Sequence, residues 1–327
     1  MHHLYKFITI LTLLFISLTT HAGGGITHML IAEQSIKHVS DMHLRNLLLD
    51  NLDAYLVGAN YPDSGFVAGT HYGEDSHWDP FIFTFADYIK QTYSQPEFEN
   101  PRLVAFLFGC ATHSVSDIII HWTFYPKSAA EDFHGNWNLA HQHGDFDLDL
   151  VINVDKDRWF AHPQTWWVPV QELTEVYRRM GKSEYTSKEI ILGNSIYSLA
   201  GIGERAIALP AYPFLKLKMP WTTKHYEDAK EGGLLVDEVA VAKYMDQLWL
   251  RLHNKPYHLL HLTAFKKPPH HDVSNPAIRF AEDALQNGTA SMPAATKPDG
   301  SVEINAPVIV NAEQYNRLLS QLEKRVE

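Results

Sequence analysis

The sequence predicts an all-α protein, and two observations lead to this prediction. Apolar residues recur at helical spacing through most of residues 27–253. Strand signals are few, apart from one short strand-like run at 302–310, and there is no internal repeat. The chain has 327 residues, 45% of them hydrophobic, which suffices to bury a sizeable core. We therefore expect a single multi-helix domain followed by a C-terminal extension.

Residues 1–22 have the pattern of a secretory signal peptide. Lys6 is basic, an apolar run follows from Phe7 to Leu18, and Thr20-His21-Ala22 is a small-x-small cleavage site. The run is shorter than the roughly 20 apolar residues that span a bilayer. An uncleaved anchor is the alternative. No later segment is predicted to cross a membrane, so we expect export into the periplasm or the medium.

The first helices of the mature chain are separated by one loop. Thr27 is a plausible N-cap for a helix that reaches about Val39, and helical spacing continues over residues 40–57. Residues 58–73 are rich in Gly, Pro and Asp and are predicted to form a loop. Another helix is expected at 79–92.

A strongly apolar helix is predicted to begin at Pro101 and to reach about His121. Residues 126–146 are polar and irregular by pattern. Two further helices are expected at 186–207 and 234–253. Between them lies an aromatic and proline-rich segment, 208–221.

The composition changes after Lys267. A Ser/Ala/Pro-rich stretch at 288–301 precedes the strand-like run, and a final amphipathic helix is expected at 312–326. We therefore predict a main domain at 23–267 and an extension at 268–327, whose role the pattern does not indicate.

Composition narrows the function. The net charge of −11 argues against a protein whose main partner is a nucleic-acid backbone. The single cysteine, Cys110, excludes an internal disulfide framework and a zinc cluster of thiolates. Histidine, by contrast, occurs 20 times. Because histidine is the commonest metal ligand, the composition favours a site built from nitrogen and oxygen ligands.

The strongest local motif is His113…Asp117…His121. Residues four apart advance by about 40° around an α-helix, so these three side chains share one face of about 80°. The rest of this helix is apolar, and buried charge must be paired or metal-bound. A hydrogen-bonded ladder within a helical core is the alternative interpretation.

Further histidines and aspartates flank this motif, and no thiolate accompanies them. His141 and Asp145 are also four residues apart, and Asp63 lies at a turn in the predicted loop. Taken singly, each flanking residue is more typical of a solvated loop, or of a core in which its side chain has hydrogen-bond partners. Taken together, they exceed the needs of one ion and predict a multinuclear zinc site. The set consists of His28, Asp63, His77, His113, Asp117, His121, His141 and Asp145.

On these motifs, with DFHG at 132–135 and AHQHGD at 140–145, the chain resembles the zinc-dependent phospholipase C family. The same motifs are similar to the N-terminal domain of glycosylphosphatidylinositol-specific phospholipase D and, more distantly, to fungal zinc-dependent single-strand nucleases. The resemblance covers about residues 23–265. It implies an all-helical catalytic domain with three zinc ions in a cleft and with the mature amino terminus as a ligand.

The resemblance also implies a ligand set for each ion, with Asp117 bridging two of them. Gly23, His28 and Asp117 would hold the first ion; Asp63, His77, His113 and Asp117 the second; and His121, His141 and Asp145 the third. Gly23 and Asp145 stand where bacterial members of the family usually have Trp and Glu. Cleavage after Ala22 would free Gly23, so the signal-peptide pattern and the resemblance indicate the same bond. His134 and His143 are expected to orient ligands.

The function expected from the resemblance is that of a secreted zinc phospholipase C. Zinc-activated water would attack the phosphodiester and release diacylglycerol and a phosphorylated head group, with Asp63 orienting or deprotonating the water. Phospholipase D-type cleavage of glycolipid anchors, a nuclease, and a non-catalytic zinc- or lipid-binding protein are the alternatives. The nuclease is disfavoured because there is no basic stripe interleaved with aromatics.

The expected partner is a phospholipid at a membrane surface, with no nucleic acid. Trp166-Trp167 and the segment 210–221 mix aromatic and basic residues, as interfacial surfaces do. Simple core packing of these aromatics is an equal alternative. The sequence carries no signal for the oligomeric state.

Overall fold

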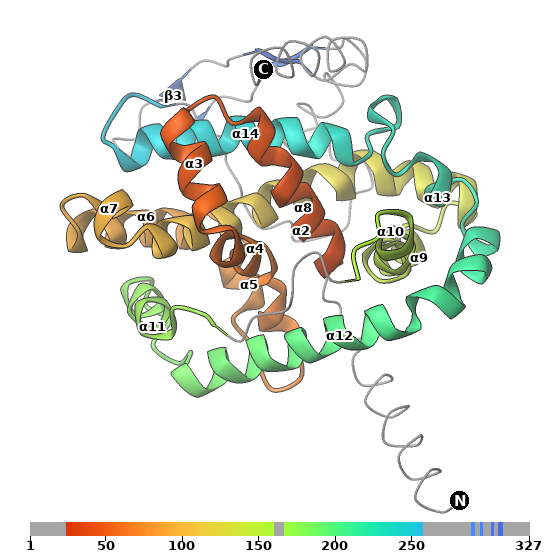
Figure 1. Cartoon of the computed structure of the whole chain (residues 1–327), viewed down its shortest axis with the longest axis horizontal. Helices are drawn as coiled ribbons and strands as arrows, with labels where there is room; N and C mark the ends of the chain where they lie inside the picture. The colour runs from red at the N-terminus through yellow and green to blue at the C-terminus, as the bar shows by residue number, and fades with distance from the viewer. Residues whose placement is uncertain are drawn as a thin grey trace, which may run out of the picture.

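The computed structural model describes residues 24–159 and 167–257, with short stretches at 289–291, 295–296, 302–303 and 307–309. The fold is all-α, as predicted (Figure 1). The helices up to the central one are α2 (Gly25–Ser35), η1 (Ile36–His38), α3 (Met42–Asp50), α4 (Leu52–Asn60), η2 (Asp63–Phe66), α5 (Gly73–Ser76), α6 (Asp79–Thr92), α7 (Pro96–Glu99) and α8 (Pro101–Asp132). Those that follow are α9 (Trp137–Asp145), α10 (Asp147–Asp155), α11 (Val170–Arg179), α12 (Ser187–Lys218), α13 (Thr222–His225), η3 (Ala229–Glu231) and α14 (Leu234–Leu252).

Helix α8 forms the centre of the core. It begins with Pro101, and the Asn100 side chain caps it by accepting a hydrogen bond from the Leu103 backbone nitrogen. Helices α2, α4, α9 and α14 pack around it, and Figure 1 shows α8 passing behind α2 and α4. At the crossing with α4, a Cβ on Gly109 would lie under 3.0 Å from the Tyr55 carbonyl oxygen. Glycine therefore lets the two helix backbones meet.

By length and composition, α8 could cross a membrane, and it is the one helix in the described ranges with this property. Length and composition alone do not decide whether a helix crosses a membrane, so the expectation that no later segment does so stays a prediction. Within the protein, 94% of the most apolar 18-residue stretch of α8 is buried. The central helix of a folded core has the same composition, because it is surrounded by other elements on all sides.

The stretch 126–146, predicted to be irregular, is mostly helical. Helix α8 continues through Pro126 to Asp132, because Ser128 and Ala129 are buried there and the Ser128 hydroxyl bonds that of Thr222. A proline inside a helix removes one hydrogen bond, which such packing can offset. Gly135 then takes a φ of +80° in the turn before α9.

The helix predicted at 186–207 is also longer than expected. Helix α12 runs from Ser187 to Lys218, through Pro210 and Pro213. The Thr186 side chain caps its start by accepting a hydrogen bond from the Glu189 backbone nitrogen. Both prolines are solvent-exposed, so their rings project away from the core. In Figure 1, α12 lies along the edge of the molecule opposite α14.

Short strands follow the helical domain. Strand β1 (Thr289–Ser291) pairs antiparallel with β4 (Pro307–Ile309), with Thr289 opposite Ile309, and β2 (Ala295–Thr296) pairs antiparallel with β3 (Val302–Glu303). Strands β3 and β4 lie within the predicted strand-like run. The predicted signal peptide at 1–22 and helix at 312–326 lie outside the described residues.

Candidate metal centre

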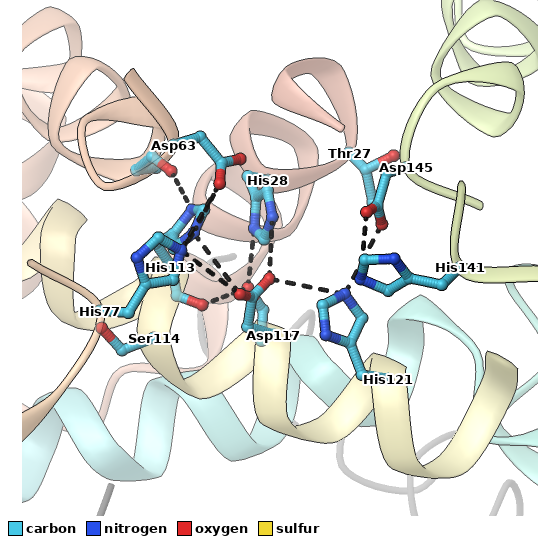
Figure 2. Close-up of polar contacts among 12 residues, drawn as sticks. Thr27, His28, Asp63, His77, His113, Ser114, Asp117, His121, His141 and Asp145 are labelled. Carbon is cyan, nitrogen blue, oxygen red and sulfur yellow. Dashed lines mark hydrogen bonds and ion pairs between the residues drawn. The ribbon is translucent and has the colours of Figure 1, made fainter. Parts of the chain in front are cut away.

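Eight of the nine predicted ligand residues converge in one place, as Figure 2 shows. Helix α8 supplies three of them from one face, as the four-residue spacing predicts. Gly23 lies outside the described residues. The contributors are His28 from α2, Asp63 from η2, His77 after α5, His113, Asp117 and His121 from α8, and His141 and Asp145 from α9.

The centre is closed at one end and more open at the other. The His113 side chain is 0% exposed, whereas those of His121 and His141 are 19% and 25% exposed. Because all three belong to the same cluster, a molecule from solvent reaches the α9 end first.

Asp117 stands at the middle of the cluster. Its Oδ1 faces the Nε2 atoms of His28 and His121 at 3.3 and 3.8 Å. Its Oδ2 faces those of His77 and His113 at 3.5 and 3.7 Å. Because one carboxylate oxygen faces each side, the residue could bridge two ions.

Backbone and hydroxyl contacts fix which histidine nitrogen faces the centre. The Nδ1 atoms of His77 and His113 lie 2.6 and 2.8 Å from the carbonyl oxygens of Gly73 and Ala59. A carbonyl oxygen only accepts, so each Nδ1 carries the proton and donates. In the neutral rings, both Nε2 atoms then present lone pairs to one another, 2.9 Å apart.

The same logic holds for His28. Ser116 donates its hydroxyl proton to the His113 carbonyl oxygen, so its oxygen accepts from His28 Nδ1 at 2.9 Å. The inward-facing atoms of these histidines and of Asp63 and Asp117 are therefore all acceptors. Such a cluster needs cations, either protons or metal ions.

The spacing of these acceptors fits zinc. Ligand atoms in a tetrahedral zinc site stand about 3.3–3.5 Å from one another, because each lies about 2.0–2.2 Å from the ion. The nitrogens of His77 and His113 lie 3.5 to 3.7 Å from the oxygens of Asp63 and Asp117. These four side chains could hold one ion, and they are the set that the resemblance implies for the second ion.

A second group lies at the α9 end. The carboxylate oxygens of Asp145 lie 3.6 and 3.3 Å from the Nε2 atoms of His121 and His141. The Tyr125 hydroxyl donates to Asp145 Oδ1, and the Trp137 ring stacks on that of His141. These contacts orient Asp145 and His141, which together with His121 could bind a further ion, a role that stays a prediction.

Helix α2 is tied to this end of the centre. The backbone nitrogens of Ile26 and Thr27 donate to the buried Asp149 carboxylate at 2.7 and 2.8 Å. A Cβ on Gly24 would lie 2.7 Å from the Asp145 carbonyl oxygen, so only glycine fits there. Gly24, the residue before α2, therefore lies directly beside a candidate ligand.

Proton affinities in the metal-free cluster follow from burial and charge. Burial lowers the pKa of His121, but the charge of Asp117 and the hydrogen bond to Asp145 outweigh it and raise the pKa to about 9. The pKa values of His28 and His77 are likewise raised, since hydrogen bonds to Asp117 and Asp63 offset burial. Burial and the charge of His28 lower that of His113 to about 3.

Zinc binding is therefore expected to release protons. The charged form of His121 is stabilised in the folded metal-free protein below pH 6.5, and this stabilisation is lost as the pH rises through about 9. A zinc ligand must be unprotonated, so zinc affinity should fall as the pH is lowered from 9. Calorimetry at pH 7 in buffers of different ionisation enthalpy measures the release, and His121→Asn should reduce it by about one proton. Equal heats in all buffers would contradict the prediction.

Two histidines expected to orient ligands do not contact them. His143 bonds Asp147 at 2.7 Å and lies 3.2 Å from Lys218 Nζ. His134 is exposed, in the turn after α8, with a φ of +52°. Both residues lie beside ligand motifs in the sequence. On helix α9, however, His143 lies on a different face from His141 and Asp145.

Other residues orient the candidate ligands. Ser116 fixes His28, Tyr125 bonds Asp145, and the Tyr197 hydroxyl donates to Asp63 Oδ2 at 3.3 Å. Tyr125 extends the four-residue series of 113, 117 and 121, and that spacing could have revealed it. Tyr197 comes from α12, and no spacing connects it with the motifs.

Comparisons with known proteins agree with this picture. The family described as zinc dependent phospholipase C matches residues 27–186. Phosphatidylinositol-glycan-specific phospholipase D of Homo sapiens is 30% identical over 228 residues, 64% of this chain and 27% of that protein. The protein of that name from Dictyostelium discoideum is 27% identical over 247 residues, 70% of this chain and 26% of that protein. The chain thus spans about a quarter of the length of these relatives. No solved structure matches it.

Proposed function

This chain belongs to the zinc-dependent phospholipase C family over residues 27–186, and from this we propose that it is a phospholipase C. It would hydrolyse the glycerol-side phosphodiester bond of phospholipids, using three zinc ions. The observation that carries the proposal is the cluster of inward-facing acceptors around Asp117. Its donor set of imidazole and carboxylate groups suits zinc and offers more ligands than one ion takes.

Bound zinc supplies a Lewis acid that makes water nucleophilic near neutral pH and stabilises charge on a phosphoryl group. The residues of the chain have separate tasks. Burial raises the pKa of Asp63, but the charge of His113 and the hydrogen bond from His77 outweigh it and lower that pKa. Asp63 is therefore ionised at neutral pH, and we propose that it orients the attacking water and accepts its proton.

Tyr197 holds the proposed base in place. Its hydroxyl donates to Asp63 Oδ2, whereas Asp63 Oδ1 is the atom facing His77 and His113. The more exposed His121 and His141 lie where a phosphodiester from outside would arrive. In this proposal, the base acts from the buried end of the cluster and the substrate enters at the α9 end.

We also propose that the protein is exported and that removal of residues 1–22 completes the centre. The narrow passage at Gly24 supports this, because Gly24 itself packs against the Asp145 backbone. An amino group freed at Gly23 would add a nitrogen ligand to the cluster. Among the described residues of α2, His28 is the one candidate ligand.

Phospholipase D-type cleavage is a second candidate, favoured by the name of the curated relatives. The two reactions break different P–O bonds of the same substrate. Phospholipase C releases diacylglycerol, whereas phospholipase D leaves phosphatidate.

The test is incubation of the mature chain, beginning at Gly23 and loaded with zinc, with mixed phospholipid vesicles and with a glycosylphosphatidylinositol. Mass spectrometry of the lipid products is expected to show diacylglycerol that disappears when zinc is chelated and returns when it is restored. Phosphatidate would instead favour the second candidate. A zinc-loaded protein that yields no lipid product would contradict both.

A further inference from the structure

Large hydrophobic side chains are exposed mainly on one helix. Among the eleven that are exposed in the described part of the chain, seven lie on α12. Leu209, Phe214 and Leu217 are 63%, 71% and 81% exposed. The seven are Ile191, Leu192, Leu199, Ile202, Leu209, Phe214 and Leu217. Scattered exposed apolar residues are normal, but a concentration on one element marks a binding surface.

These side chains form a continuous stripe. At about 100° per residue, they fall within an arc of about 140° along about 39 Å of helix. Between 191 and 217, the other exposed residues are Ala206, Pro210 and Pro213. Every exposed residue of this span is thus apolar, and its charged residues, Glu204, Arg205 and Lys216, are half-buried.

Basic residues stand at the two ends of the stripe. Lys188 is exposed before it, and Lys218 is exposed after it. An apolar face with lysines at its edges matches the interface of a phospholipid bilayer, where acyl chains meet anionic or zwitterionic head groups. The protein carries a net charge of −11, so basic residues at this place are not the consequence of a basic surface overall.

The opposite face of α12 contacts the candidate metal centre. Tyr197 donates to Asp63, and its ring packs against Gly25, where a Cβ would lie 3.2 Å from the ring edge. Gly193 packs against the Ser64 backbone beside Asp63. An α-helix with its side chains is about 10–12 Å across, so the stripe and the centre are separated by one helix.

We propose that the exposed stripe of α12 binds the surface of a phospholipid bilayer, so that this helix lies between the membrane and the metal centre. The proposal rests on the proposed function, since it concerns delivery of the lipid substrate. Two of the tryptophans in the predicted interfacial segments, Trp167 and Trp221, pack against core aromatics instead. Trp167 packs edge-on against Phe106, Trp221 stacks on Phe124, and Trp166 lies outside the described residues.

A matched pair of triple variants tests the proposal. Leu199→Gln/Leu209→Gln/Phe214→Gln removes three exposed side chains of the stripe. Met42→Gln/Leu49→Gln/Phe98→Gln removes three from other helices, where the exposed fractions are 63%, 52% and 74%. Flotation with vesicles of phosphatidylcholine, alone and mixed with phosphatidylglycerol, is measured with zinc chelated, so that lipid is not consumed.

We expect the α12 variant to bind vesicles at least about tenfold more weakly than the unaltered chain, because each side chain loses the free energy of leaving water. The control variant should bind as the unaltered chain does. Unchanged binding of the α12 variant, or an equal loss in both variants, would overturn the proposal. So would a dimer of the unaltered chain that the α12 variant converts to monomers, since the stripe would then be a contact between copies.

Hydrolysis of a short-chain phospholipid below its critical micelle concentration separates this proposal from the proposed function. Zinc-loaded α12 variant and unaltered chain should hydrolyse it equally, because no bilayer is involved. If neither hydrolyses it, the proposed function fails, while the vesicle measurement still decides the fate of the stripe.

Discussion

Asp117→Asn is expected to lower hydrolysis by at least about 1,000-fold and to reduce the amount of zinc retained, because the ligand that we propose is shared between two ions is altered. The two carboxylate oxygens face four histidine nitrogens, two on each side. An amide keeps one acceptor and replaces the other with a donor group. It also removes the negative charge that offsets the ions.

Asp132→Asn is the matched control, because Asp132 lies on the same helix and within the DFHG motif. Its carboxylate accepts from the backbone nitrogens of Trp221 and Thr222, far from the ligand set along α8. We expect it to cost about 1 kcal/mol of stability, as loss of a cap does, and to leave zinc content unchanged. Metal analysis, lipid product yield and circular dichroism distinguish the two. An Asp117→Asn protein with full zinc and activity within tenfold would remove Asp117 from the proposed mechanism.

Gly109→Ala is expected to destabilise the fold by about 3 kcal/mol or more, the upper range for forcing atoms into a packed core. The added Cβ would lie under 3.0 Å from the Tyr55 carbonyl oxygen and from the Gly58 backbone, so α4 and α8 must separate. Ala59, next to Gly58, supplies the carbonyl oxygen that orients His113. Zinc affinity should therefore fall together with the melting temperature.

Gly135→Ala serves as the comparison for this glycine. A Cβ there meets nothing within 4 Å, although the φ is +80°. Its expected cost of about 1 kcal/mol measures backbone strain alone, without a clash. Thermal and urea unfolding give both values. Equal losses in the two variants would show that the close approach of α4 and α8 is not what Gly109 provides.

The sequence could predict what depends on periodicity and motif. The four-residue spacing placed His113, Asp117 and His121 on one face, and the structure brings them together with five other candidate ligands. Helix ends were predicted less well. The two helices were expected to end near His121 and at 207, yet α8 continues through Pro126 and α12 through Pro210 and Pro213, because tertiary packing outweighs one lost hydrogen bond.

Contacts between distant segments could not be predicted from one sequence. Asp149 bonds the start of α2, and Tyr197 bonds Asp63 across 134 residues. No local pattern records such pairs, since each is a single polar residue within an otherwise ordinary helix. The exposed stripe on α12 was predicted only in part, through the segment 210–221, because apolar residues at helical spacing look alike whether they face a core or the outside.

The convergence of candidate ligands from α2, η2, α8, α9 and the residue after α5 has a consequence for the stability of the chain. Ions bound there would act as cross-links between segments that are far apart in sequence, and such links reduce the conformational freedom of the unfolded chain. With Cys110 as its single cysteine, the protein has no disulfide of its own to do this. The same ions that we propose for catalysis would then also stabilise the fold. Chelation would lower the free energy of unfolding as well as abolish activity.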